Sequence, residues 1–235
     1  MNRMTAAGAA AAALTAFLFF LYRLRGIRKR TGARITAGEF INAVGFSLLP
    51  GLAFWKAFEP YILSYTGKEV PAPLPLLPWV TAEGRFYPSR IETAALVIAF
   101  TAIVLWLVFR KEDLPGNGDL LLSVICVWAA IRSVTESFRQ DPLAGIGPVS
   151  LFVCLSIAAG LLCLAIWTAR RGRKTKNAGL TILDWLAVIA CGAVMILQDA
   201  GVLSLGSGIA DLAARCGCAV LSMVLILITG KDSRN

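Results

Sequence analysis

Three charged residues that close an apolar stretch are the first candidates for chemistry in this sequence. Arg132, Glu136 and Arg139 are spaced i, i+4, i+7, which places them on one face of a helix over about 10 Å. Arginine suits phosphate because its planar fork makes two charge-assisted hydrogen bonds and stays ionised when partly buried. The spacing therefore predicts a face that could clamp a phosphate. A local interpretation stays open, in which Arg132 and Glu136 neutralise each other within a bundle and Arg139 extends to the interface.

Further ionisable residues flank the apolar stretches that precede this triad. They are expected at helix ends on the same side of the membrane as the triad, so they could share a ligand with it. These residues are Lys56, Glu59, Glu83, Arg85, Tyr87, Arg90 and Glu92. This set of charges favours an anionic phospholipid headgroup as the ligand.

Histidine is absent from the sequence, which excludes Ser-His and Cys-His catalysis and any imidazole metal site. A general base would have to be Glu, Asp, Tyr or Lys. The six cysteines lie within apolar stretches and lack the spacing of a metal site, so they are interpreted as small apolar residues. We therefore expect neither a metal ion nor a cofactor.

The composition is that of an integral membrane protein. Of the 235 residues, 57% are hydrophobic and 16% charged, and the mean hydropathy is +0.72. Seven apolar stretches are long enough to cross about 30 Å of hydrocarbon. They cover residues 4–22, 37–58, 93–109, 119–138, 142–169, 179–198 and 208–229. The sequence predicts an all-α polytopic bundle that forms a single integral membrane domain over residues 1–235.

The distribution of basic residues predicts the orientation of the chain. Short cytoplasmic loops collect Lys and Arg, and basic residues are concentrated at 23–34 and 170–176. Both segments are expected inside, which puts the N-terminus outside and the C-terminus inside. The net charge of +9 is then explained by topology and does not require a nucleic-acid partner. A signal peptide is a competing interpretation of residues 1–22, but the basic block that follows favours a span.

Two other features are the charged residues near the C-terminal apolar stretches and a proline-rich segment. Arg215 lies in the last apolar stretch with Asp211 one turn earlier, which predicts a self-satisfied pair. Asp199 is expected near a span end and is given no role. The segment from Tyr65 to Ser89 is rich in proline and aromatic residues, so it is interpreted as either a lid on the outer leaflet or a tethering loop.

The motifs beside the triad show a resemblance to a known family. The segment Tyr87-Pro-Ser-Arg-Ile-Glu92 is followed by an apolar span, a basic Pro-Gly loop at 110–116 and the motif Arg132-xxx-Glu136-xx-Arg139-Gln-Asp-Pro. This order resembles the C-terminal half of bacterial prolipoprotein diacylglyceryl transferases, which contains a helix that ends in Arg-xxx-Glu-Phe-x-Arg. The resemblance is strongest over 85–175, within a family-like region of about 25–175. Residues 179–229 would be two extra C-terminal spans.

The resemblance implies a seven-span enzyme of the bacterial cytoplasmic (inner) membrane, with the same orientation that the charges predict. Such enzymes move the diacylglyceryl group of phosphatidylglycerol onto the lipobox cysteine thiol of a preprolipoprotein and release glycerol phosphate. By this resemblance Arg132 and Arg139 would neutralise the phosphate, and Glu136 would orient them. Tyr87 completes the expected catalytic set, because Tyr87 or Glu136 would handle the proton.

The sequence departs from the family pattern at several positions. Tyr87 and Arg90 stand where the family has histidine and glutamine, and Glu92 falls one place early. The family's Gly-Arg-x-Gly-Asn-Phe and His-Gly-Gly motifs are absent. Lys56, Arg85 or Arg90 would supply the missing positive charge, with Ser89 in the same headgroup site.

Two functions are therefore expected from different classes. The first is a divergent transferase that acts on phosphatidylglycerol and a lipobox-containing preprolipoprotein. The second is a non-catalytic relative that keeps the lipid or lipopeptide site and serves as a scaffold or partner subunit of another membrane protein. A small transporter is less favoured, because no pair of Gly/Pro-broken helices is expected to meet at the bilayer midplane.

Overall fold

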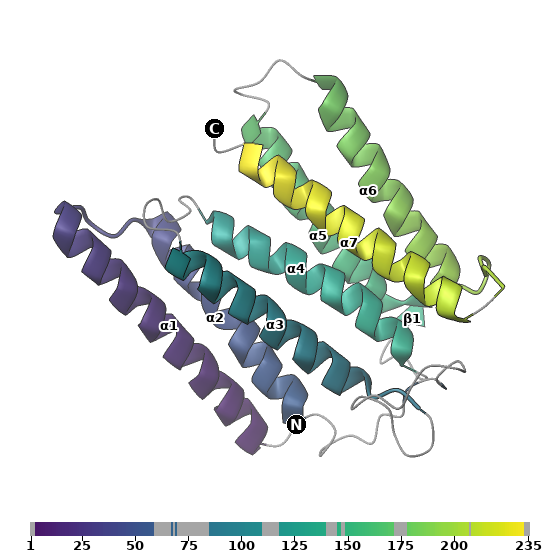
Figure 1. The fold of residues 1–235 in the computed structure, drawn as a ribbon, viewed down its shortest axis with the longest axis horizontal. Helices are drawn as coiled ribbons and strands as arrows, with labels where there is room; N and C mark the ends of the chain where they lie inside the picture. Colours follow the sequence, from purple (N-terminus) through teal and green to yellow (C-terminus); the bar gives the residue numbers. More distant parts are fainter. Residues whose placement is uncertain are drawn as a thin grey trace. The chain divides into compact units, whose positions relative to one another are not determined.

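Long helices account for most of the computed structural model, which describes residues 3–58, 67, 69, 85–109, 118–139, 145–146, 149–171, 178–206 and 208–232 (Figure 1). The helices are α1 (Arg3–Thr31), α2 (Ala37–Phe58), α3 (Pro88–Phe109), α4 (Asp119–Thr135), α5 (Leu151–Arg171), α6 (Ala178–Asp199) and α7 (Gly208–Asp232). Within the described ranges, seven helices are long and apolar enough to cross a membrane. The chain is an all-α, multi-pass membrane protein, as its sequence predicts.

Two predicted spans have different limits in the structure. The basic residues expected in the first loop continue α1 as far as Thr31, since Arg and Lys are good helix formers. The span expected to begin at 142 begins as α5 at Leu151. A short hairpin precedes it, formed by β1 (Gly145–Ile146) and β2 (Val149–Ser150), which pair antiparallel.

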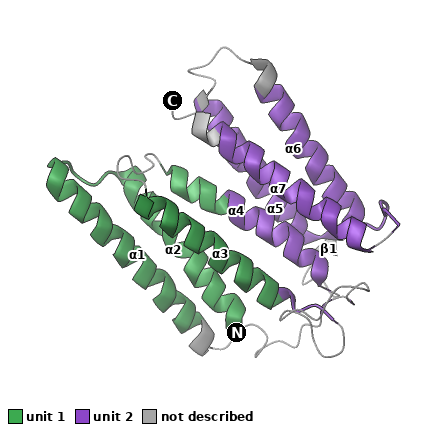
Figure 2. Cartoon of the chain, viewed as in Figure 1, with its two compact units in different colours: residues 1–64, 89–125 green, residues 65–88, 126–235 purple. Residues whose placement is uncertain are grey.

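The chain divides into two compact units, each described by itself below (Figure 2). Unit 1 contains residues 1–64 and 89–125, which carry α1, α2, α3 and the first part of α4. Unit 2 contains residues 65–88 and 126–235, which carry the rest of α4, the hairpin and α5 to α7.

In unit 1, α1 packs along α2, and aromatic rings fill the space between the helices. The Phe46 ring lies 5.1 Å from the rings of Phe20 and Phe100. Asn42 of α2 accepts hydrogen bonds from the backbone N–H groups of Leu120 and Leu121, at 2.9 and 3.4 Å. These contacts satisfy the first backbone donors of α4, which would otherwise lack partners at a buried helix start.

The turn between α1 and α2 is held by a capping box. The Thr36 hydroxyl accepts a hydrogen bond from the Glu39 N–H, and the Glu39 carboxylate accepts one from the Thr36 N–H at 2.8 Å. Gly32, with φ +68°, adopts the left-handed conformation that ends α1. Glu39 also pairs with Arg28, so this arginine serves the corner between the helices.

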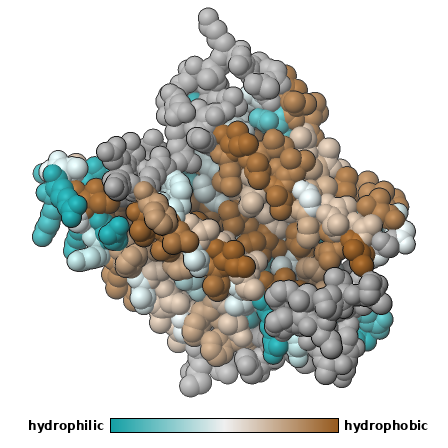
Figure 3. All heavy atoms as spheres, viewed as in Figure 1, coloured by the Kyte–Doolittle hydropathy of each residue, from teal (hydrophilic) through white to brown (hydrophobic). Residues whose placement is uncertain are grey.

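In unit 2, α5, α6 and α7 pack on one another. Several of their large apolar side chains remain exposed, including Leu162 of α5, Leu183 of α6 and Val220 of α7. Hydrophobic residues, drawn in brown, also cover much of the face shown in Figure 3. Exposed apolar surface on helices of membrane-spanning length is suited to contact with lipid chains.

Candidate functional site

The end of α4 carries the triad predicted from the sequence, in a different local conformation. The α-helix ends at Thr135, and Glu136 begins a 3₁₀ turn, η2 (Glu136–Phe138). Arg139 follows in an extended conformation, and its N–H donates to the Glu136 carbonyl at 3.1 Å. The triad therefore does not lie on one continuous α-helical face, because the last turn tightens before Arg139.

Glu136 nevertheless joins the two arginines. Its Oε2 lies 2.8 Å from an Nη of Arg132 and 3.4 Å from Nε of Arg139. All three side chains are buried, with at most 5% of each exposed. The Arg132 guanidinium also lies 4.7 Å from the centroid of the Phe152 ring, in the position of a cation–π contact. Paired charges and an aromatic face offset the cost of burying these groups.

The cluster extends through the hairpin to two helices near the C-terminus. The Ser150 hydroxyl donates to Glu136 Oε1 at 3.2 Å, while the Ser150 N–H donates to Asp199 Oδ2 at 2.7 Å. Asp199 in turn lies 3.4 Å from Arg215 of α7. Arg132, Glu136, Ser150, Asp199 and Arg215 thus form a connected polar network within unit 2.

Arg215 has a different partner from the one predicted. The Asp211 carboxylate instead accepts hydrogen bonds from the Leu205 N–H at 2.7 Å and the Ser204 hydroxyl at 3.2 Å. Arg215 pairs with Asp199 and donates to the Met195 carbonyl at 3.1 Å. The expected self-satisfied pair is wrong, because the turn before α7 occupies Asp211 and α6 brings Asp199 to Arg215.

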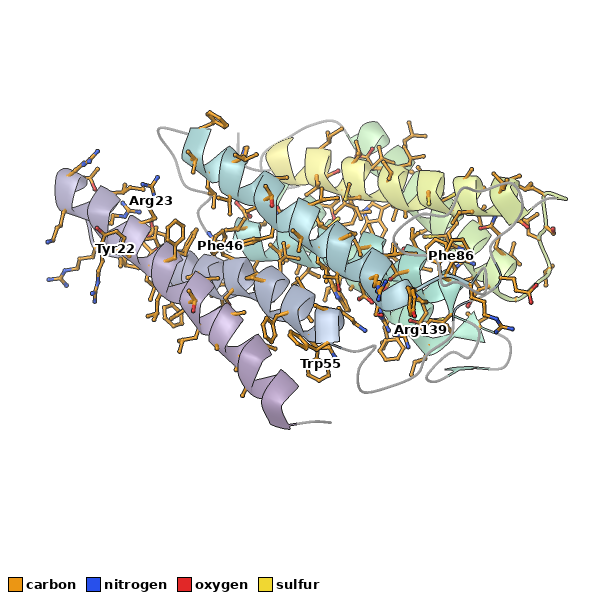
Figure 4. All side chains as sticks on the ribbon, turned by 60° about the horizontal axis from the view of Figure 1, so that its bottom comes forward. Tyr22, Arg23, Phe46, Trp55, Phe86 and Arg139 are labelled. Carbon is orange, nitrogen blue, oxygen red and sulfur yellow. The ribbon has the colours of Figure 1, made fainter. Side chains whose placement is uncertain are left out.

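Arg85 and Tyr87 lie in a short extended segment of unit 2. Arg85 pairs across an isolated β-bridge with Glu69, and Gly67 pairs in the same way with Arg139. The Phe86 ring packs on Phe138, with centroids 4.6 Å apart. Arg139 and Phe86 are labelled at this end of the unit in Figure 4.

The Arg85 and Tyr87 side chains of this segment are more accessible than those of the triad. The Arg85 guanidinium lies 3.8 Å from the Glu69 carboxylate, with 29% and 83% of the two side chains exposed. Such a pair contributes little to stability because water screens it. Tyr87 is half-buried. The extended segment thus connects Arg85 and Tyr87, which are partly accessible, with Arg139, the last residue of the buried triad.

The other predicted headgroup residues belong to unit 1. Lys56 of α2 lies 3.4 Å from Glu92 of α3, and both side chains are largely buried. Ser89 is buried at the start of α3, and Arg90 is exposed. Glu59 and Glu83 lie outside the described residues, as does most of the segment from Tyr65 to Ser89 interpreted as a lid or loop.

A hollow of about 230 Å³ borders the network in unit 2. Arg215, Gln198 and Asp211 line it, together with Glu69 and the ring of Phe86. Glu69, the β-bridge partner of Arg85, and Phe86, its neighbour in sequence, both line the hollow, which therefore borders the extended segment that carries Arg85. Arg215 is therefore part of both the polar network and the lining of the hollow.

The arrangement can stabilise negative charge. Three guanidinium groups and two carboxylates meet in a buried setting, where electrostatic interactions are stronger than in water. Among the described residues, no group of three His, Cys, Asp or Glu side chains could hold a metal ion.

Sequence reasoning missed Ser150, Asp199 and Arg215 as parts of the cluster. Ser150 is 14 residues from Glu136 and 49 from Asp199, so no local spacing could indicate these contacts. The charge of Arg215 within an apolar stretch was the available signal, because buried charges in membrane helices require partners.

In comparisons with known proteins, no family model, no curated protein and no solved structure matches this chain.

Proposed function

We propose that this protein is a divergent relative of the prolipoprotein diacylglyceryl transferases, located in the bacterial cytoplasmic membrane. It would bind the phosphodiester of phosphatidylglycerol at the arginine cluster of unit 2. The observation that carries the proposal is the joining of Arg132 and Arg139 by Glu136. Two forked cations fixed by one buried carboxylate are preorganised for a phosphate, because their positions are set before the ligand arrives.

In the proposed reaction, the sulfur of a lipobox cysteine forms a bond to a glyceryl carbon of the lipid. The carbon–oxygen bond to phosphate breaks, its electron pair stays on the phosphate oxygen, and glycerol phosphate leaves. Positive charge from Arg132 and Arg139 would stabilise the departing phosphate. Because the oxygens of Glu136 already hold Arg132, Arg139 and Ser150, Glu136 is suited to positioning. Tyr87, reacting as its phenolate, is then our candidate to accept the thiol proton.

A second candidate is a non-catalytic lipid- or lipopeptide-binding subunit of another membrane protein. The observation that favours it is the same ion-pair cluster, since arginines satisfied by Glu136 can serve the fold alone. The absence of histidine from the sequence also favours a role without acid–base chemistry.

A transfer assay tests the first proposal. The purified protein is reconstituted with phosphatidylglycerol labelled in its acyl chains and a lipobox peptide, and thioether-linked lipid on the peptide is measured. We expect turnover in the wild type and a loss of at least 100-fold in Arg139→Gln, because one phosphate-stabilising donor contributes about 10²–10³ in rate. Arg34→Gln is the control, since Arg34 is exposed in the turn before α2.

The two candidates give different results in this assay. Turnover that Arg139→Gln abolishes and Arg34→Gln leaves intact supports the transferase. Absence of turnover, with phosphatidylglycerol still bound in an arginine-dependent way, supports the non-catalytic subunit. Absence of both turnover and arginine-dependent binding would contradict both proposals.

A further inference from the structure

The basic end of α1 borders a second hollow, which is lined by residues of unit 1 alone. Its volume is about 820 Å³, and ligand sites in proteins are typically about 300–1,000 Å³. Helices α1, α2 and α3 all contribute to the lining, so the hollow is a feature of the packed unit and not of one helix surface. The space is therefore large enough for part of a lipid molecule.

One part of the lining is strongly basic. Arg23, Arg25, Lys29 and Arg30 border the hollow, and all four side chains are exposed. Arg28, between them in sequence, is used by Glu39 at the corner with α2. Over the ranges that the structure describes, none of the four forms an ion pair with a carboxylate. Their positive charge is thus available to a ligand.

The figures show where this charge lies within unit 1. Hydrophilic side chains gather at the C-terminal end of α1 in Figure 3. In Figure 4, Tyr22 and Arg23 project near this end of the helix, and Phe46 of α2 lies beside it.

The rest of the lining is apolar. Nine of the fourteen lining residues are aliphatic or aromatic. Of these, Phe20, Leu24 and Phe46 are buried, while Val108 of α3 is 53% exposed. Basic groups beside an apolar groove match a molecule that has an anionic headgroup and a hydrocarbon chain.

We propose that this hollow binds one phospholipid with an anionic headgroup. The headgroup phosphate interacts with the basic residues that end α1, and an acyl chain lies along Phe46 and Leu107. The occupant is a lipid and not free phosphate, because most of the lining would be poorly hydrated around a small anion. By the positive-inside rule this site faces the cytoplasmic leaflet. The inference does not rest on the proposed transferase activity.

Photochemical labelling tests the proposal at the level of the site. The full-length protein is placed in phosphatidylcholine nanodiscs with a small fraction of phosphatidylglycerol that carries a photoreactive group in an acyl chain. After illumination, the labelled peptides are mapped by mass spectrometry. We expect label on residues 19–27 and 104–108, displaced by unlabelled phosphatidylglycerol but neither by phosphatidylcholine nor by inorganic phosphate.

The variant Arg23→Gln/Lys29→Gln should reduce this label at least about 10-fold, since each basic residue at an anionic lipid surface contributes roughly fivefold in affinity. Arg34→Gln is the matched control from the same basic segment and should leave the label unchanged. Leu107→Trp keeps every charge but fills the groove, so it should also reduce the label. Circular dichroism and thermal unfolding verify that each variant remains folded.

Equal labelling by photoreactive phosphatidylcholine would overturn the proposal, because it would indicate contact with bulk lipid only. Unchanged labelling in the folded Arg23→Gln/Lys29→Gln variant would overturn it as well. Arg139→Gln should not affect label at these residues, which separates this site from the cluster in unit 2. The proposal of a lipid site in unit 1 can therefore be confirmed or contradicted independently of the proposed transferase activity.

Discussion

Glu136 is the residue on which the arginine cluster depends. It is 3% exposed and binds Arg132, Arg139 and the Ser150 hydroxyl at once. A carboxylate that is buried away from water requires such partners. Without the negative charge of Glu136, the two buried guanidinium groups would lack the carboxylate that neutralises them. Its importance for stability should therefore exceed that of an exposed glutamate with one arginine partner.

Glu136→Gln tests this difference. We expect a loss of about 3–5 kcal/mol in unfolding free energy, because one member of a buried ion-pair network is neutralised. The loss is measured as a decrease in the midpoint of thermal unfolding in detergent. Glu69→Gln is the control, since its pair with Arg85 is exposed and such pairs contribute about 0–1 kcal/mol. Equal midpoints for the two variants would contradict the assigned role of Glu136.

Gly67 is a second position where one residue decides local structure. An added Cβ would lie 2.3 Å from the Phe86 carbonyl oxygen and 2.9 Å from that of Phe138, so both backbones would have to move. Gly67→Ala should separate the extended segment from Arg139 and lower the unfolding midpoint.

The control for this substitution is Gly26→Ala in α1, where the added Cβ would meet no described atom within 4 Å beyond the backbone of its own helix. It should stabilise the helix by about 0.5–1 kcal/mol, because alanine loses less backbone entropy than glycine. A Gly67→Ala protein as stable as the wild type would show that the close backbone contact is not required.

At the scale of elements, the hairpin β1–β2 connects the end of α4 with α6 and α7. Ser150, its last residue, uses its hydroxyl for Glu136 and its N–H for Asp199. Asp199 ends α6 and pairs with Arg215 of α7. The two C-terminal helices thus support the arginine cluster, although the resemblance to the transferases ends before them.

A double-mutant cycle measures this support. Asp199→Asn and Arg215→Gln should be non-additive by about 0.5–3 kcal/mol, as expected for residues in direct contact. The comparison cycle combines Asp211→Asn with Arg215→Gln, whose coupling should be smaller, about 0.5 kcal/mol or less, because the two residues lie one turn apart on α7 and the Asp211 carboxylate bonds to Leu205 and Ser204 instead. Both cycles use the unfolding free energy in the same detergent. The reverse result, with coupling to Asp211 alone, would favour the local pair that the sequence suggested.

The helices could be predicted from the sequence, whereas the hairpin and the tertiary contacts of the arginine cluster could not, for physical reasons. Seven apolar stretches correspond to seven long helices in the described parts of the chain, because hydrocarbon thickness fixes the length of a span. The hairpin β1–β2 was missed because Gly145, Gly147 and Pro148 carry no charge and so do not interrupt the apolar stretch, although Gly and Pro favour turns. The pairing of Arg132 with Glu136 follows from spacing along one chain segment. The contacts of Ser150 and Arg215 depend on tertiary packing, which no local pattern encodes.

At the scale of the whole molecule, the orientation predicted from the basic residues stays a prediction. The two basic segments at 23–34 and 170–176 should both face the cytoplasm. A phosphatase reporter that is active only outside should be inactive when fused after Asn235 and active when inserted after Gly201, which lies in the short connection between α6 and α7. Activity of the C-terminal fusion would reverse the assigned orientation.

The orientation also fixes where each lipid would be bound. Under the predicted topology the arginine cluster at the end of α4 faces the outer side, while the basic end of α1 faces the cytoplasm. The two proposed lipid sites would then draw on different leaflets. Variants of one site should leave binding at the other unchanged.

Binding of phosphatidylglycerol to the arginine cluster is the central claim, and ligand-dependent stabilisation measures it most directly. The unfolding midpoint of the purified protein is recorded with increasing phosphatidylglycerol, with phosphatidylcholine of the same chains as the reference. To isolate the cluster, the background carries Arg23→Gln/Lys29→Gln. In this background we predict stabilisation by phosphatidylglycerol alone, lost in Arg132→Lys/Arg139→Lys, because lysine keeps the charge but not the fork. Equal stabilisation in that variant, or by phosphatidylcholine, would contradict the claim.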